Sequence, residues 1–493
     1  MWVCGWFNGV YVTMQSWNAI SETGHRHVGT RFPRLGHLLV LLALAGCRAE
    51  RPEMWDEHKL PAPNLSWSQA TVAAEPELAA NATLTFDRAA EIALAHHPDI
   101  ARADAQVDAA NARVGQALAG YFPQLRLTTS LSRATGNPSA ADGDNNHGSL
   151  GWSDTDGSVR GGLGLTQLVF DFGKTAAAKR QAEHQLAATA ADAAAVGLDT
   201  LLEARDAYLT LLADNALTDV AAQTVQNFEN HLTETETQVR VGRRTEADVA
   251  KSRVDVGEAK LELLRARNAA AIARLTLNRV MSLEEDPGYQ LQDTPPALGF
   301  EVAEADAVAQ ARLSRTEIAA ARERFEVARA QLQRAWLQYF PTISFSASFD
   351  AAGDQFPLAQ NWSLGPTLDW NVLNGGRVIK EVEEAEASWR AARAELAATE
   401  QRIYFAVRQA LLDHGESLER AEVARETVAS SQESLRLISG RYQVGRATLL
   451  EQTDAELAFS RARAEEIRAR YDAERSAARL LRAMGLAVAE KQP

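Results

Sequence analysis

Few residues of this chain have the types and spacings that catalysis or metal binding requires. The 493-residue sequence contains no G-x-S-x-G, H-E-x-x-H, phosphate-binding-loop or dinucleotide-binding motif. His96-His97 could supply metal ligands, but Pro98 follows directly, and such a pattern is more typical of the end of a short helix. Only two cysteines occur, Cys4 and Cys47, so a disulfide framework or a cysteine-based zinc site is excluded. We therefore expect neither an enzyme nor a bound cofactor.

Two acidic residues are spaced so that they share one face of a helix. Glu451 and Asp454 are three positions apart, so both carboxylates project from the same side. Taken alone, such a pair is usually part of a solvated surface, because the chain has 65 Asp and Glu residues against 51 Lys and Arg residues. The resulting net charge of −14 argues against nucleic acid as the main partner.

The only long apolar run precedes Cys47. Residues 38–45 read LLVLLALA, and Arg31 and Arg34 precede them. This run is too short to span a bilayer, which takes about 20 residues, and it favours a secretory signal. The residues LAGC that end at Cys47 resemble a bacterial lipoprotein signal, which implies cleavage before Cys47 and its acylation; a plain signal with a coincidental cysteine is the alternative. Residues 1–30 do not look like the start of a signal, so we expect translation to begin nearer Val28.

The chain after residue 84 contains an internal repeat. Three motifs occur twice: Tyr121-Phe122-Pro123 as Tyr339-Phe340-Pro341, VFDFGK at 169–174 as VLNGGR at 372–377, and Val241-Gly242-Arg243 as Val444-Gly445-Arg446. The first pair is offset by 218 positions and the other two by 203. One insertion in one loop explains the difference, so two copies of one unit are the economical interpretation.

Each copy is predicted to contain two β-strands. Apolar residues alternate with polar ones directly after Pro123 and Pro341, which indicates strands with one apolar and one polar face. Weaker second strands follow loops at 134–157 and 351–360. Strands of about ten residues suit a tilted membrane strand, although a soluble sheet with one wet face is the alternative. Because open sheet edges are not viable in lipid, four membrane strands require an oligomer, and a trimer would supply 12.

Long helices are predicted to make up most of the chain. Residues 174–238 and 378–438 lack proline and contain one glycine each, and helices of this length span about 100 Å. Leucines at coiled-coil spacing and many alanines indicate lateral packing. The remaining predicted helices are 98–120, 245–281, 316–338 and 448–485.

The doubled motifs resemble the TolC-like outer-membrane factors of tripartite efflux and type I secretion. The resemblance covers about residues 84–486 and implies an α+β fold, mainly α, in which a homotrimer forms a 12-stranded barrel in the outer membrane and a coiled-coil helical tunnel in the periplasm. The implied segments are a signal peptide at 1–46, a lipid-anchored extension at 47–83, a first repeat at 84–282, a belt linker at 283–300 and a second repeat at 301–493.

The resemblance also implies roles for the two Val-Gly tips. Val241, Gly242, Arg243, Val444, Gly445 and Arg446 would contact a periplasmic adaptor protein, although arginine after each glycine departs from the usual aliphatic or small residue. Asp248 and Tyr442 match positions that hold the periplasmic gate closed. A third family position, an arginine, is Ala447 here, so that bond is missing unless Arg446 replaces it. Glu451 and Asp454 match an acidic ring inside the tunnel mouth.

Two functions of different classes follow. The first is a trimeric exit duct that passively conducts substrates from an inner-membrane pump and its adaptor through the outer membrane. The second is a lipid-anchored periplasmic coiled-coil scaffold without a channel. The alternating strands, the Gly/Asp loops and the signal favour the duct. The transported substrate is not readable, because the wall of such a duct is generic.

Overall fold

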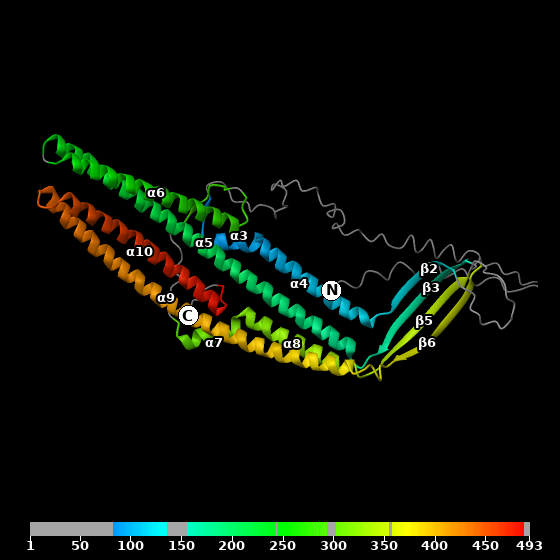
Figure 1. The fold of residues 1–493 in the computed structure, drawn as a ribbon. Helices are drawn as coiled ribbons and strands as arrows, with labels where there is room; N and C mark the ends of the chain where they lie inside the picture. The colour runs from blue at the N-terminus through cyan, green and yellow to red at the C-terminus, as the bar shows by residue number, and fades with distance from the viewer. Residues whose placement is uncertain are drawn as a thin grey trace, which may run out of the picture. The chain divides into compact units, whose positions relative to one another are not determined.

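The computed structural model describes residues 82–135, 155–242, 244–284, 286–292, 302–353 and 357–487, all within the unit Val72–Pro493. Its first half runs α3 (Phe86–His96), α4 (Pro98–Leu118), the 3-10 turn η2 (Ala119–Tyr121), β2 (Gln124–Thr135), β3 (Thr155–Phe170), α5 (Lys174–Arg240) and α6 (Glu246–Val280). Its second half runs α7 (Glu304–Ser314), α8 (Thr316–Leu337), β5 (Thr342–Gly353), β6 (Ala359–Asp369), α9 (Arg377–Gln443) and α10 (Leu449–Met484). The predominance of helix and the predicted bounds of the long helices are confirmed within a few residues (Figure 1).

Both long helices begin after a residue pair with positive φ. Gly173 precedes α5 at φ +94° and Gly376 precedes α9 at +82°. The residue before each is also left-handed, and in the first copy it is Phe172, at φ +59°. A residue that carries a Cβ atom rarely adopts this left-handed backbone conformation. The Asp171 carboxylate stabilises the turn, since it accepts a hydrogen bond from the Gly173 N–H at 2.9 Å.

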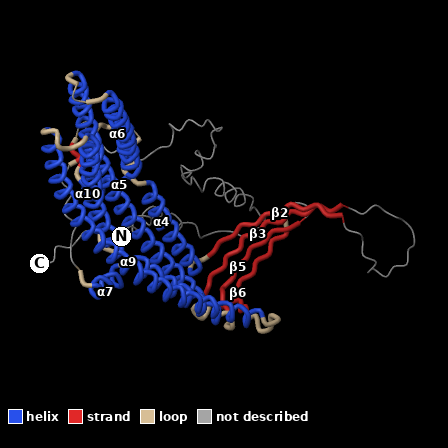
Figure 2. Tube along the Cα trace, turned by 60° about the vertical axis from the view of Figure 1, so that its left-hand side comes forward, coloured by secondary structure: helices blue, strands red, loops and turns tan. Residues whose placement is uncertain are grey.

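The four long strands form one antiparallel sheet in the order β2-β3-β5-β6 (Figure 2). Its register aligns apolar side chains into rows across the sheet, one of which is Leu127, Leu163, Phe349 and Trp362. The adjacent polar row contains Thr128, Gly162, Asp350 and Asn361. The sheet therefore has one apolar face and one polar face, as the period-two sequence predicts. Within this chain β2 and β6 are its edges.

The helices pack as two antiparallel hairpins, α5 with α6 and α9 with α10, and α10 also lies against α5 (Figure 1). Near the middle of α5, Tyr208 is fully buried, and its hydroxyl accepts a hydrogen bond from the N–H of Gln292 at 3.2 Å. Beside it the short strands β1 (Thr83–Leu84) and β4 (Gln290–Leu291) pair in parallel. Among the described helices, none is both long and apolar enough to cross a membrane.

A row of polar contacts, here called the polar seam, joins α5 to α10. In order along α10 the contacts are Gln452–His231 (3.4 Å), Glu456–Asn227 (2.5 Å), Ser460–Thr224 (3.0 Å), Arg463–Gln223 (2.5 Å), Arg475–Asp206 (2.8 and 3.0 Å) and Arg482–Asp199 (2.6 Å). The partners on α5 run in the opposite order, so the helices are antiparallel. The seam connects the two halves of the sequence over most of the length of α10.

The C-terminal end of α10 is held closely against the turn between α7 and α8. Gly485 ends α10 at φ +77°. A Cβ atom at this position would lie 2.8 Å from the backbone carbon of Ser314. The same junction contains Arg482, which donates to Glu317 at 2.7 Å. Both the backbone conformation and the close approach therefore require glycine.

We expect Gly485→Ala to lower the free energy of unfolding by about 1–3 kcal/mol, because alanine adds steric overlap to an unfavourable left-handed conformation. The matched control is Gly415→Ala in the middle of α9, where a Cβ meets no atom within 4 Å. That change should raise stability by about 0.5–1 kcal/mol. Urea unfolding followed by far-UV circular dichroism measures both, and equal effects of the two substitutions would contradict the prediction.

Candidate functional site

The Val-Gly motifs are the turns that end the long helices. Val444 caps α9, and Gly445 follows it at φ +73°. The N–H of Gly445 donates to the Tyr442 carbonyl at 2.9 Å, and that of Arg446 donates to the Arg441 carbonyl at 2.8 Å. This pair of bonds is a Schellman motif, which requires a left-handed residue at the glycine. The first tip is similar, with Gly242 at φ +78° and its N–H bonded to the Val239 carbonyl at 2.9 Å.

Each return helix begins with a capping box. Thr245 and Asp248 form the box of α6, and Thr448 and Glu451 form the box of α10. The N–H of Thr245 donates to the Asp248 carboxylate at 3.0 Å, and that of Thr448 donates to the Glu451 carboxylate at 2.6 Å. Asp248 and Glu451 are 203 positions apart, which is the repeat offset. The two residues therefore have the same local role, which stabilises the helix start at each tip.

The capping bonds lower the pKa values of both carboxyl groups. The Thr245 N–H and hydroxyl lower the pKa of Asp248, and the charge of Arg244 adds to this effect. The Thr448 N–H and hydroxyl lower the pKa of Glu451, with a contribution from Arg441. Because the native pKa values are depressed, the stabilisation is complete at neutral pH and is lost as pH falls through these values.

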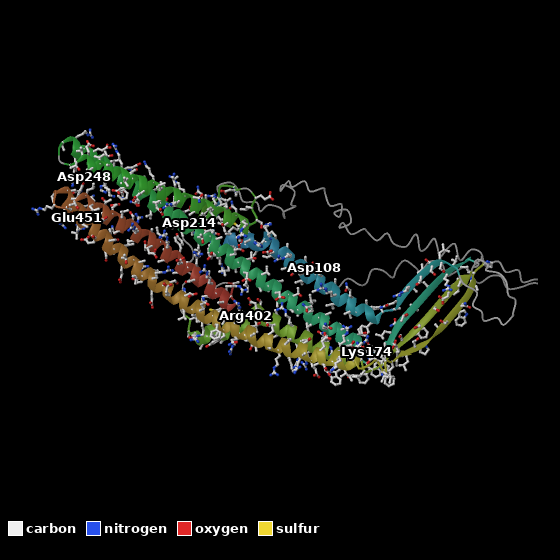
Figure 3. The ribbon with its side chains drawn as sticks, viewed as in Figure 1. Asp108, Lys174, Asp214, Asp248, Arg402 and Glu451 are labelled. Atoms are coloured by element: carbon white, nitrogen blue, oxygen red, sulfur yellow. The ribbon has the colours of Figure 1, made fainter. Side chains whose placement is uncertain are left out.

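Glu451 and Asp454 lie on the same exposed face of α10. Their neighbours Gln452, Thr453 and Ala455 are buried. Figure 3 shows Asp248 and Glu451 at the tips of the two hairpins, at the opposite end of the helices from Lys174, where the strands begin. The predicted acidic pair is thus accessible to solvent in the single chain.

A contact between the tips involves Arg244, which the sequence does not single out. Its guanidinium lies 4.9 Å from the centre of the Tyr442 ring, and its Nε donates to Gln238 at 3.2 Å. Tyr442 is buried against Ala447. In the repeat, Arg244 corresponds to Ala447, the position where the resemblance leads us to expect an arginine. An arginine of the first tip therefore meets Tyr442 by a cation–π contact, while the matching position of the second tip is alanine.

Of the remaining predicted site residues, some are exposed at the tips and others lie outside the described part of the chain. Val241, Val444 and Arg446 are exposed at the tips. Arg243 and the predicted lipidation site Cys47 lie outside the described residues. The Asp248 carboxylate accepts hydrogen bonds from the N–H and the hydroxyl of Thr245, and within the described residues no hydrogen bond joins it to Tyr442.

The histidines near residue 97 have a structural role. His97 separates α3 from α4, and its Nδ1 accepts a hydrogen bond from the Asp99 N–H at 3.3 Å, with Pro98 at the first helical position. This confirms the helix-end interpretation of the motif. In the described part of the chain, no group of three or more His, Cys, Asp or Glu side chains could hold a metal ion.

The model of the outer membrane efflux protein family matches residues 89–282 and 307–486, most of the chain. The chain belongs to this family. Its two matched segments contain the two hairpins with their tips.

Curated relatives agree with this membership. Outer membrane protein OprJ of Pseudomonas aeruginosa is 27% identical over 447 residues, which cover 85% of this chain and 88% of that protein. Outer membrane protein TolC of Escherichia coli is 24% identical over 410 residues, which cover 76% of this chain and 77% of that protein. This efflux family member is therefore an outer-membrane protein that serves as an exit duct for efflux.

Solved structures show the same fold. The outer membrane channel CmeC of Campylobacter jejuni superposes with a TM-score of 0.69 at 16% identity, over 83% of this chain and 87% of that one. The arrangement of strands and long hairpins is therefore that of a known channel fold.

Replacement of Arg244 by alanine should let the tips of this family member separate. The change removes the contact with Tyr442, an interaction of about 1 kcal/mol, and should raise single-channel conductance in planar bilayers. Tyr442→Leu should act in the same direction, whereas Tyr442→Phe should not, because it keeps the ring.

The matched control for Arg244→Ala is Arg253→Ala. Arg253 bonds to Glu236 at 3.1 Å within the first hairpin and does not join the two tips. If the Arg244→Ala and Arg253→Ala variants have the same single-channel conductance, Arg244 does not hold the tips together.

Proposed function

We propose that three copies of this chain form a 12-stranded barrel in the outer membrane, continued by a helical tunnel in the periplasm. The edges of the sheet carry the proposal. Strands β2 and β6, of 12 and 11 residues, each pair on one side only in this chain. An unpaired edge is not viable in lipid, because no water is available for its N–H and C=O groups. Pairing β6 of one copy with β2 of the next satisfies both edges and closes the ring.

The exposed apolar face of the sheet supports an arrangement in which this face forms the outside of the barrel and contacts lipid. Leu131 is 82% exposed and Trp362 is 77% exposed in the single chain. Side chains of this size are expensive to leave in water, and a lipid-facing position removes that cost. The polar face, with Arg126 and Asp350, then lines an aqueous lumen, as in other transmembrane barrels.

Aromatic residues at the junction of strands and helices support a membrane boundary there. The doubled Tyr-Phe-Pro motif contributes Tyr121, Phe122, Tyr339 and Phe340, all exposed. Trp370 is also exposed, and its Nε1 donates to the Tyr339 carbonyl at 3.0 Å. Aromatic rings that keep a polar bond are typical of the lipid–water interface. The motif that reveals the repeat thus marks the periplasmic edge of the membrane.

The repeated order of elements supports two tandem units at 84–282 and 301–493. The short β1–β4 pair and the segment 283–300 then belong to a belt around the tunnel. A duct built in this way has no energy source, so an inner-membrane pump and a periplasmic adaptor that meets the tips complete the system. Among the relatives, one is named a probable efflux pump outer membrane protein, which supports such partners.

The exposed face of Glu451 and Asp454 supports an acidic ring at the periplasmic mouth. In a trimer, threefold symmetry brings six carboxylates around one opening. Such a ring attracts cations and lets a multivalent cation bridge several groups. Glu451 contributes while it also caps α10, since its capping bonds keep the carboxylate ionised.

Planar-bilayer recording tests the duct and the ring together. Glu451→Gln/Asp454→Asn removes both charges, and glutamine preserves the capping box. We expect lower cation selectivity and the loss of block by a trivalent cation. Because the pKa of Glu451 is lowered, the wild type should keep its Glu451 charge until pH falls below the ordinary glutamate range.

The control for the ring is Asp104→Asn/Asp108→Asn, which removes two exposed charges of α4. If both double variants keep the selectivity and block of the wild type, the carboxylates of α10 are ordinary surface charges. If the purified wild type gives no conductance steps at all, the chain is instead the channel-less coiled-coil scaffold, and the barrel proposal fails.

Lipidation of Cys47 adds an anchor to the barrel. Native mass spectrometry of the detergent-extracted protein should give three copies per particle, each beginning at an acylated Cys47. Cys47→Ser should lose the lipid mass but keep the trimer, because the barrel holds the copies together. An unmodified Cys47 in the membrane fraction would remove the anchor, and a monomer would remove the barrel.

A further inference from the structure

A cavity lies among helices α4, α5 and α8, in the half of the helical region that is nearer to the sheet. Helix α5 lies between the other two and contacts both (Figure 1). The cavity has a volume of about 390 Å³, and small-molecule sites measure about 300–1,000 Å³. Its lining includes Ala178 and Ala182 of α5, whose short side chains leave the space open. The cavity is therefore large enough to hold a small ligand.

The polar lining of this cavity consists of hydrogen-bond donors and neutral amides. Arg113 of α4 and Arg334 of α8 supply the charge, and Gln116, Gln181 and Gln185 supply amide groups. None of the described side chains that line it is acidic. A guanidinium group only donates hydrogen bonds, and an amide can donate as well as accept. The lining therefore suits an anion and repels a cation.

The fold makes no use of the two arginines that line the cavity. Arg113 and Arg334 are exposed, and neither forms a hydrogen bond or an ion pair in the described residues. The other arginines of α8 behave differently, because Arg322, Arg324 and Arg329 each form an ion pair. Arg334 is thus the exception on its own helix, and its side chain is available to a ligand.

Acidic side chains on the neighbouring turns do not neutralise these arginines. Asp108 of α4 is five positions before Arg113, which places it about 140° around the helix. Glu183 of α5 pairs with Lys179 at 2.9 Å. Glu326 of α8 pairs at 3.3 Å with the arginine three positions after it. The cavity is consequently a locally positive site on a chain whose net charge is −14.

In the proposed duct, the cavity begins at the depth of the periplasmic lipid headgroups. The part of α5 that lines it, residues 178–185, lies roughly 6–17 Å along the axis from the helix start at Lys174, beside the end of the sheet. Headgroups extend about 5–8 Å beyond the hydrocarbon on each side of a bilayer. Pairing of β6 with β2 of the next copy brings a neighbour to α4 and α9, whereas the cavity is centred on α5. The cavity therefore belongs to one copy.

We propose that this cavity binds a glycerol phosphate group, either as the headgroup of an anionic phospholipid or as a soluble phosphate ester. The planar forks of Arg113 and Arg334 match the oxygens of a phosphate, with which arginine forms bidentate, charge-assisted hydrogen bonds. The glutamine amides bond the glycerol hydroxyls, since an amide both donates and accepts. The depth of the cavity rests on the proposed duct function, but its lining does not. Basic pockets between helices at the membrane surface bind lipid headgroups in this way.

Two probes distinguish the sources of the phosphate in the full-length protein in detergent. Native mass spectrometry compares phosphatidylglycerol with zwitterionic phosphatidylcholine of the same acyl chains. Isothermal titration calorimetry compares soluble glycerol 1-phosphate with glycerol. We expect phosphatidylglycerol to bind about tenfold or more tighter than phosphatidylcholine, because the second lipid carries its own cation. Binding of glycerol 1-phosphate shows that the headgroup alone is recognised, whereas binding of phosphatidylglycerol alone assigns the site to lipid.

The matched variants each remove two exposed arginines that form no ion pair in the described chain. Arg113→Gln/Arg334→Gln should weaken phosphatidylglycerol binding by about tenfold or more. Arg180→Gln/Arg390→Gln should leave it unchanged, since these arginines lie on α5 and α9 but do not line the cavity. Thermal unfolding by circular dichroism verifies that both variants are folded. Equal weakening by the two variants makes net charge responsible, and the proposal is then wrong.

The remaining outcomes separate this inference from the duct. If neither phosphatidylglycerol nor glycerol 1-phosphate binds the wild type, or if phosphatidylcholine binds equally well, the cavity is not a phosphate site. Channel conductance in planar bilayers is recorded for the same preparations. Normal conductance without phosphate binding contradicts this inference alone. Binding that depends on Arg113 and Arg334 in a protein without conductance contradicts the duct and leaves the site in place.

Discussion

The polar seam between α5 and α10 is the constraint on which the rest of the structure depends. Much of the helix surface is alanine, which permits close approach but is too uniform to fix how far one helix slides along another. Polar pairs such as Glu456–Asn227 do fix it, because a shift would leave the buried Glu456 carboxylate without its hydrogen bond to the half-buried Asn227. The seam contributes little net stability, but it specifies a single register between the two halves of the chain.

That register determines what meets at the tips. Each hairpin alone has a locally encoded turn: a left-handed glycine ends one helix, and a threonine with an acidic residue three positions later starts the next. The seam sets the position of one turn relative to the other along the helix axes, and the outermost contact of the seam is Gln452–His231. This axial position brings Arg244 to the ring of Tyr442. A change in the seam should therefore alter the position of the two tips relative to each other, because long helices transmit an axial shift along their whole length.

The features that depend on local sequence could be predicted, and those that depend on the seam could not. The helix bounds, the strand alternation and the Val-Gly turns follow from signals a few residues long. The shared capping role of Asp248 and Glu451 was also readable, since Thr-x-x-Asp and Thr-x-x-Glu recur at the repeat offset. The Arg244–Tyr442 contact joins residues almost 200 positions apart, and no local pattern gives the register that creates it. The left-handed Phe172 is hidden for a different reason, because phenylalanine gives no sign of positive φ where its counterpart in the repeat is glycine.

The charge of the tips illustrates why overall composition is a poor guide to a site. Net charge predicts solubility and long-range steering, but it does not say which charges a fold uses internally. Here the turn chemistry requires an acidic residue at the start of each return helix, so Asp248 and Glu451 are tied to backbone N–H groups. Arg244 and Arg441 lie close enough to these carboxylates to lower their pKa values further. The tips of an acidic protein are therefore mixed in charge, an arrangement that the net charge of −14 does not reveal.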